Sequence, residues 1–196
     1  ESIKVTNEED ESKGISKLSV TRWTVRADWF QRIIDNYSFL YELWDECLKE
    51  LGLNRDIKSR IIGCKAQMGT FDLYFGLKLG KLLYAHTDKL SQTLQIEKIS
   101  AVSSKRLAML TVKTISDLNN AESFNLLYDL CMKEIQKISF VDEPILKRKR
   151  KEPKYSLLHY LDGCESTSEA DYPKTPRDRY RKLYYEAIDV LISSIR

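Results

Sequence analysis

The chain has 196 residues, of which 42% are hydrophobic and 31% charged, with a formal net charge of +3. This balance predicts a folded, soluble protein with one sizeable core, and so mild a charge by itself predicts neither a nucleic-acid partner nor a membrane partner. Only 7 glycines and 4 prolines are present, which disfavours an all-β sandwich or barrel with many tight turns.

The chain opens with residues 1–18, which are polar and acidic and are expected to form a flexible lead-in outside the core. Helical periodicity starts after Trp23. From Trp29 to Leu51, large apolar residues recur at spacings of three and four, which predicts one long helix with a single apolar face. Gly52 is a typical residue for ending such a helix.

Four further helices are predicted, and with the first they make a helical core over residues 19–140. Asn54 is expected to cap the second helix, which Gly69 and Thr70 end near Met68. A fourth helix is expected to begin near Ser100, and Ser123 to cap the fifth. The apolar stripes of the third, fourth and fifth helices are Phe71, Tyr74, Phe75, Leu79, Leu82, Leu83, His86, Leu90 and Leu94; Leu107, Leu110, Ile115 and Leu118; and Phe124, Leu127, Tyr128, Cys131, Ile135 and Ile138.

The composition changes over residues 141–174, where prolines, a basic run and a serine-rich stretch predict a linker or loop. Pro176 directly after Thr175 is typical of a helix start. An amphipathic helix is therefore expected over residues 175–196 and should pack back on the core. Because no segment shows the alternation of a strand, the fold class predicted is an all-α bundle of about six helices.

Residues that usually carry chemistry are sparse. His86 lies on an apolar stripe and is interpreted as a core residue, and His159 with Cys164 makes only a weak zinc pair. The four cysteines form no close pair, so they are interpreted as reduced thiols of an intracellular protein. No catalytic residue, metal site or phosphate-binding loop is predicted. No apolar run approaches the roughly 20 residues that span a bilayer, which excludes a membrane span.

Three basic features remain. The pair Arg22–Trp23 either covers the end of the first helix or stacks an unpaired base while binding its phosphate. The basic run is either a solvated loop, a nuclear import signal or a phosphate contact, and comprises Lys147, Arg148, Lys149, Arg150 and Lys151. A second cluster places positive charge at the start of the last helix, where it opposes the helix dipole. This placement indicates either an anionic partner or, equally, a solvated face. The cluster includes Lys174, Arg177, Arg179, Arg181 and Lys182.

The stretch "LSVTRWTVRADWF", residues 18–30, resembles the "TRW-x-x-R" segment of hAT (hobo–Activator) transposases, in particular the animal group with MYM-type or TTF-type zinc fingers. The aromatic helix after it, the helices that follow and the order of basic linker and final helix are also similar. The likeness covers about residues 17–196. On this chain the motif positions are Arg22, Trp23 and Arg26.

The resemblance implies a helical insertion domain of an RNase H-like transposase. It implies that Trp23 stacks a flipped base at a DNA hairpin formed at transposon ends, that the parent acts in the nucleus, and that it can form homo-oligomers. The family's catalytic acids, which bind Mg²⁺ or Mn²⁺, are expected before residue 1 and after residue 196, so no cofactor is expected here. Asp28, Asp72 and Asp88 are not assigned as metal ligands.

Two other interpretations stay open. A domesticated, transposase-derived scaffold would act in the nucleus through protein partners, with Trp23 in its core and the run 147–151 as an import signal. A helical remnant would have no function. Exposure of Trp23 on one face with the cluster at 174–182 would favour DNA binding, whereas burial of Trp23 would favour the scaffold.

Overall fold

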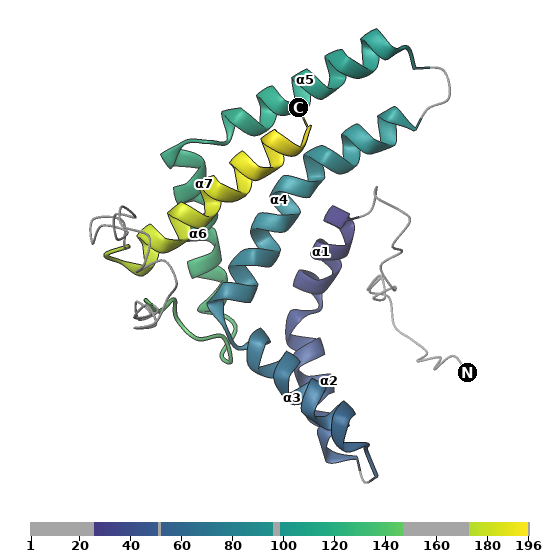
Figure 1. The fold of residues 1–196 in the computed structure, drawn as a ribbon. Helices are drawn as coiled ribbons and strands as arrows, with labels where there is room; N and C mark the ends of the chain where they lie inside the picture. Colours follow the sequence, from purple (N-terminus) through teal and green to yellow (C-terminus); the bar gives the residue numbers. More distant parts are fainter. Residues whose placement is uncertain (1–25, 51, 96–98, 147–172, 196) are drawn as a thin grey trace, which may run out of the picture.

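The computed structural model describes residues 26–50, 52–95, 99–146 and 173–195. The described residues form seven α-helices and no strand, which confirms the all-α prediction (Figure 1). The helices are α1 (Arg26–Asp35), α2 (Tyr37–Lys49), α3 (Arg55–Met68), α4 (Phe71–Leu94), α5 (Ala101–Asp117), α6 (Ala121–Ile135) and α7 (Pro176–Ile195).

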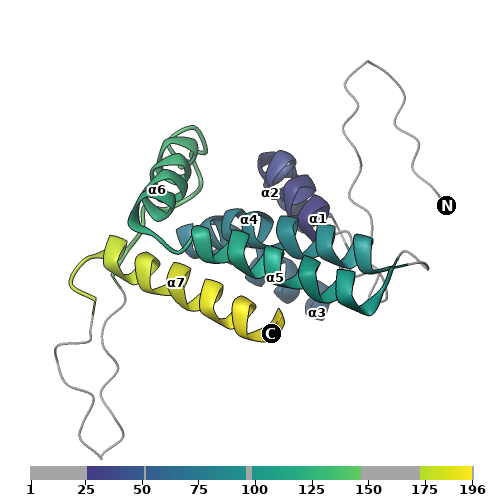
Figure 2. The ribbon, with the colours of Figure 1, turned by 90° about the horizontal axis from the view of Figure 1, so that it is seen from above.

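Helix α4 is the centre of the fold. Helix α1 packs along one side of it, while α5 and α7 contact each other and also contact α4 (Figures 1 and 2). Helix α6 contacts both α4 and α7. Helices α2 and α3 form a hairpin at one end of the molecule, and α5 lies at the opposite end (Figure 1).

The middle of the core is aromatic. The Phe71 ring meets Tyr180 edge-on with centroids 4.9 Å apart, and Phe75 lies 5.0 Å from the same tyrosine. Aromatic pairs at this spacing gain energy beyond that of the area they bury. The rings join α4, α6 and α7, and the largest fully buried side chains are Tyr37, Tyr180, Tyr184, Phe75, Phe124, Ile115, Ile188 and Cys131.

The predicted long first helix is wrong, because the chain leaves helical geometry at Asn36 and forms α1 and α2 instead. Asn36 has φ −103° and ψ 18°, and its side-chain Nδ2 donates to the Arg32 carbonyl at 2.8 Å. The Asn36 N–H donates to the same carbonyl at 3.1 Å, and a side-chain bond of this kind bends a helix. Tyr37, the next residue, is buried, and its hydroxyl donates to the Met68 carbonyl at 2.8 Å.

Polar side chains cap most of the helices, as was expected for Asn54. Asn54, Thr70 and Ser100 each accept a backbone N–H two or three residues on, at the starts of α3, α4 and α5. The cap of α6 is Asn120 and not Ser123, since the Asn120 side chain accepts the Ser123 N–H at 2.8 Å. Both residues are good caps, and the one that lies in extended geometry takes the role.

Candidate nucleic-acid interface

The predicted basic cluster lies at the start of α7, where a reciprocal cap fixes the backbone. Thr175 Oγ1 accepts the Asp178 N–H at 3.1 Å, and Asp178 Oδ2 accepts the Thr175 N–H at 3.2 Å. The hydrogen bonds from Thr175, followed by the charge of Arg181, lower the pKa of the Asp178 carboxyl. This cap offsets the positive charge that opposes the helix dipole there.

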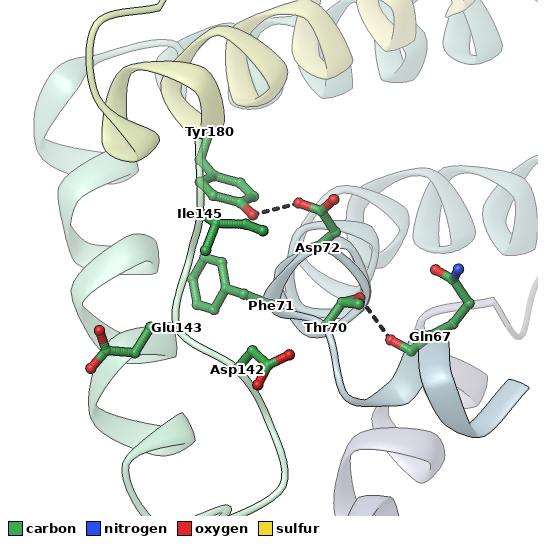
Figure 3. Close-up of a pocket in the computed structure, with 8 residues that line it drawn as sticks. All are labelled: Gln67, Thr70, Phe71, Asp72, Asp142, Glu143, Ile145 and Tyr180. Atoms are coloured by element: carbon green, nitrogen blue, oxygen red, sulfur yellow. Dashed lines mark hydrogen bonds between the residues drawn. The ribbon is translucent and has the colours of Figure 1, made fainter. Parts of the chain in front are cut away.

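Arg179 points into the molecule. Its guanidinium donates to both carboxylate oxygens of Asp72, at 2.9 and 3.1 Å. The Tyr180 hydroxyl donates to the same carboxylate, as Figure 3 shows. The hydrogen bond to Asp72 raises the pKa of Arg179, and burial together with Asp72 raises the pKa of Tyr180. The two-pronged bond joins α7 to the first turn of α4, so this arginine is a structural link.

The two neighbouring arginines also have partners on the protein. Arg177 donates to the Asn125 side chain at 2.9 Å, lies 3.1 Å from an Asp129 oxygen and covers the Tyr128 ring. Arg181 lies 3.5 Å from Asp178 and over the ring of Phe124. The structure thus brings three predicted DNA contacts together, but acidic or amide side chains and aromatic rings already surround their guanidinium groups. Lys182 is exposed.

A pocket of about 160 Å³ lies beside this cluster, between the start of α4, α7 and the segment after α6 (Figure 3). Asp72, Asp142 and Glu143 line it together with Phe71 and Tyr180. Three carboxyl groups make the pocket unfavourable for phosphate. Neither this pocket nor the inward-facing Arg179 therefore offers a surface for a nucleic-acid backbone.

The first turn of α1 is fixed on the second half of α4. The Ala27 N–H donates to the Asp88 carboxylate at 2.8 Å, and Asp88 is only 5% exposed. The Arg26 guanidinium lies 5.2 Å above the Tyr84 ring, against which Phe30 also stacks. A helix N-terminus favours a carboxylate, and here the carboxylate comes from another helix.

The outer face of the same part of α4 is basic. Lys81 and Lys89 are exposed, and neither makes an ion pair within the part of the chain that the structure describes. Ala85, exposed between them, keeps this face open. Exposed lysines without an ion-pair partner are better placed for phosphate than the paired arginines of α7.

Sequence reasoning missed Tyr84, Asp88, Lys81 and Lys89. Asp88 lies off the apolar stripe predicted for this helix, so no local pattern indicated that it would be buried. A buried charge must find a partner, which for Asp88 is the start of α1. The lysines carried no signal, since exposed lysines occur on most helices.

The remaining predicted site residues lie outside the described residues: Arg22, Trp23 and the run Lys147, Arg148, Lys149, Arg150 and Lys151. Among the residues that are described, no three histidine, cysteine, aspartate or glutamate side chains gather as they would to hold a metal ion. Asp72 and Asp88 bind Arg179 and the start of α1 instead.

No helix in the described ranges has the length and apolar character that crossing a membrane requires. Comparison of the chain with protein-family models, with curated proteins and with solved structures gives no match.

Proposed function

We propose that this chain is the helical insertion domain of a hAT transposase-like protein, that it acts in the nucleus and binds distorted DNA ends, and that it contributes no catalytic carboxylates. The proposal rests on the motif that holds Arg22, Trp23 and Arg26, and on the helical architecture around it. The observation that carries it furthest is the anchored start of α1, next to the free lysines of α4.

Chain geometry links the two features. Trp23 is three peptide units before Arg26, so their Cα atoms are at most about 11 Å apart. Arg26 rests on Tyr84, and Lys81 and Lys89 are exposed on the same helix. An indole together with cations is the combination that binds an unstacked base and its phosphates.

In this proposal the arginines of α7 have a different role from the one the sequence suggests. Because Arg179 is bonded to Asp72, and Arg177 to Asn125 and Asp129, phosphate would have to displace those partners. Phosphate attachment is therefore assigned to α4, with Lys147–Lys151 as a further electrostatic contribution. No step of the proposal uses a metal.

The test is binding to a DNA hairpin with unpaired flanking bases, compared with plain duplex, across a salt series. Trp23→Ala should remove the hairpin preference, by about 1–3 kcal/mol for each stacked base. Lys81→Glu with Lys89→Glu should weaken binding to both DNAs. It should also reduce the slope of the logarithm of the binding constant against the logarithm of the salt concentration by up to about two, if each lysine contacts one phosphate. Lys133→Glu with Lys137→Glu is the matched control, because both lysines are exposed, one in the last turn of α6 and the other just after the helix.

Equal weak binding by wild type and Trp23→Ala, together with a lower melting temperature of the variant, would overturn the DNA assignment. Trp23 would then be a core residue, and a scaffold derived from a transposase would be the better interpretation. One observation favours that second function: large apolar side chains stand exposed on several helices, among them Phe39, Val102, Met109 and Leu126. Where such side chains form a contiguous patch, they mark a site for a protein partner.

A further inference from the structure

The outer face of α2 combines apolar and acidic residues. Phe39 is 63% exposed, and Glu42, Leu43 and Glu46 are also exposed. These four residues follow one another at i, i+3, i+4 and i+7, so they form one continuous stripe along the helix. Neither glutamate makes an ion pair in the described part of the chain.

The outer face of α5 has the same spacing with the opposite charge. Val102, which is 80% exposed, is followed at i+3, i+4 and i+7 by the exposed residues Lys105, Arg106 and Met109. Lys113 extends this stripe by one more turn. None of the three cations has an ion-pair partner among the described residues.

Nothing within the described chain covers either stripe. Helix α2 packs against α3, whereas α5 packs against α4 and α7. The two helices lie at opposite ends of the molecule (Figure 1), so one copy cannot bring its own stripes together. Both stripes leave large apolar groups in water, which is unfavourable unless a partner covers them.

We propose that the α2 stripe of one molecule packs against the α5 stripe of a second copy of this chain. The pairing places two glutamates beside three cations, and it lets Phe39 and Leu43 meet Val102 and Met109. Charge complementarity of this kind selects the partner and the orientation of an interface. This inference uses surfaces separate from the proposed DNA contact and does not depend on that function.

The contact is heterologous, because different patches of the two copies meet. It therefore produces a ring if the rotation closes and an open chain of molecules if it does not. One pair of helix faces is small beside the roughly 1,200 Å² that stable interfaces bury, so the association should depend on concentration. Since its charges are exposed, it should also weaken as salt rises.

A nucleic acid is the main competing occupant of α5. Phosphate would use Lys105, Arg106 and Lys113 but would gain nothing from Val102 and Met109, and it would leave the acidic stripe of α2 unexplained. A second copy accounts for both stripes at once, and for that reason it is the occupant we propose.

The test is sedimentation velocity of the full chain at low salt over a concentration series. Wild type should self-associate. Glu42→Lys with Glu46→Lys, or Lys105→Glu with Lys113→Glu, should each weaken self-association at least tenfold, because like charges then face each other. An equimolar mixture of the two double variants should regain the wild-type association, since acidic and basic stripes are again available to each other.

Lys81→Glu with Lys89→Glu is the charge control and should sediment like wild type. All the substituted residues are exposed, and the helix content and melting temperature of every variant check that it folds. A monomeric wild type at a few hundred micromolar would overturn the proposal, and so would a mixture that fails to recover. Loss of DNA binding by Lys105→Glu with Lys113→Glu, at unchanged sedimentation, would overturn it in favour of a nucleic-acid surface.

Discussion

Arg179 and Asp72, 107 positions apart in the sequence, form a two-pronged ion pair that joins the first turn of α7 to the first turn of α4. Both side chains are mostly covered, at 19% and 29% exposure. The Tyr180 hydroxyl completes the bonding of the carboxylate. Because the pair is shielded from water and held in geometry that suits both groups, it is worth more than a surface ion pair.

Removing Arg179 should therefore destabilise the fold. We expect Arg179→Ala to lower the free energy of unfolding by about 2 kcal/mol, because it leaves the Asp72 carboxylate short of donors. Arg179→Lys keeps the positive charge but cannot form the two parallel hydrogen bonds of a guanidinium. It should lower the free energy of unfolding by about half as much. Urea unfolding measures both. Glu186→Ala, at an exposed position of the same helix, is the control and should change stability by less than about 0.5 kcal/mol. If Glu186→Ala lowered the free energy of unfolding as much as Arg179→Ala, this role of Arg179 would be refuted.

Gly80 of α4 lies directly against the Phe30 side chain of α1. A Cβ atom at this position would lie 2.9–3.1 Å from the Phe30 ring, which is itself stacked on Tyr84. Gly80→Ala should thus lower stability by about 1–3 kcal/mol through overpacking. Gly76, exposed on the same helix, has open space at its Cβ. Gly76→Ala should instead raise stability by up to about 1 kcal/mol. In thermal unfolding, the melting temperature should therefore fall for Gly80→Ala and rise for Gly76→Ala.

Asp88 holds the start of α1. Asp88→Ala removes the acceptor of the Ala27 N–H and should destabilise the protein by about 1 kcal/mol, the usual effect of losing a helix cap. Asp88→Asn keeps a side-chain oxygen that can accept the Ala27 N–H, so it should destabilise the protein less than Asp88→Ala. Hydrogen exchange provides the sharper measurement, since exchange of the Ala27 amide should accelerate in Asp88→Ala more than that of amides in α6. Uniform acceleration throughout the chain would mean that Asp88 does not act locally.

Alkaline pH should unfold the domain. Burial is the largest cause that raises the pKa of five tyrosine hydroxyls: Tyr37, Tyr74, Tyr128, Tyr180 and Tyr184. A raised pKa in the folded state means that the unfolded chain releases these protons first, so the stabilisation is complete below about pH 10 and is lost as pH rises above it. Tyrosinate absorbance and helical circular dichroism should change together. Ionisation of all tyrosines with no loss of helix would contradict this account.

The cysteines should differ sharply in reactivity. Cys131 is fully buried, and burial raises the pKa of its thiol to about 12, whereas Cys64 is exposed. Only the thiolate attacks a labelling reagent. Peptide mapping after brief alkylation at pH 8 should thus find Cys64 modified and Cys131 protected until denaturant is added. Equal labelling of the two in the native protein would show that the core opens readily.

Local sequence patterns determined which segments are helical. The threefold and fourfold spacing of apolar residues predicted the helices that became α4 to α7, and Asn54, Ser100 and Pro176 marked the starts of α3, α5 and α7. Capping and periodicity act within a few residues, so they can be read directly from the sequence. The same local patterns did not predict the break at Asn36, where the backbone leaves helical geometry although the apolar stripe continues without interruption.

Only the tertiary structure decided which charges are free. The sequence grouped Arg177, Arg179 and Arg181 as an exposed basic cluster, but the fold brings Asn125, Asp129 and Asp72 to them from α6 and α4. It leaves the cations of α5 and the glutamates of α2 without partners in the described part of the chain. Whether a charge is paired depends on residues tens of positions away, because ion pairs form between neighbours in space, and for that reason no local pattern could have predicted it.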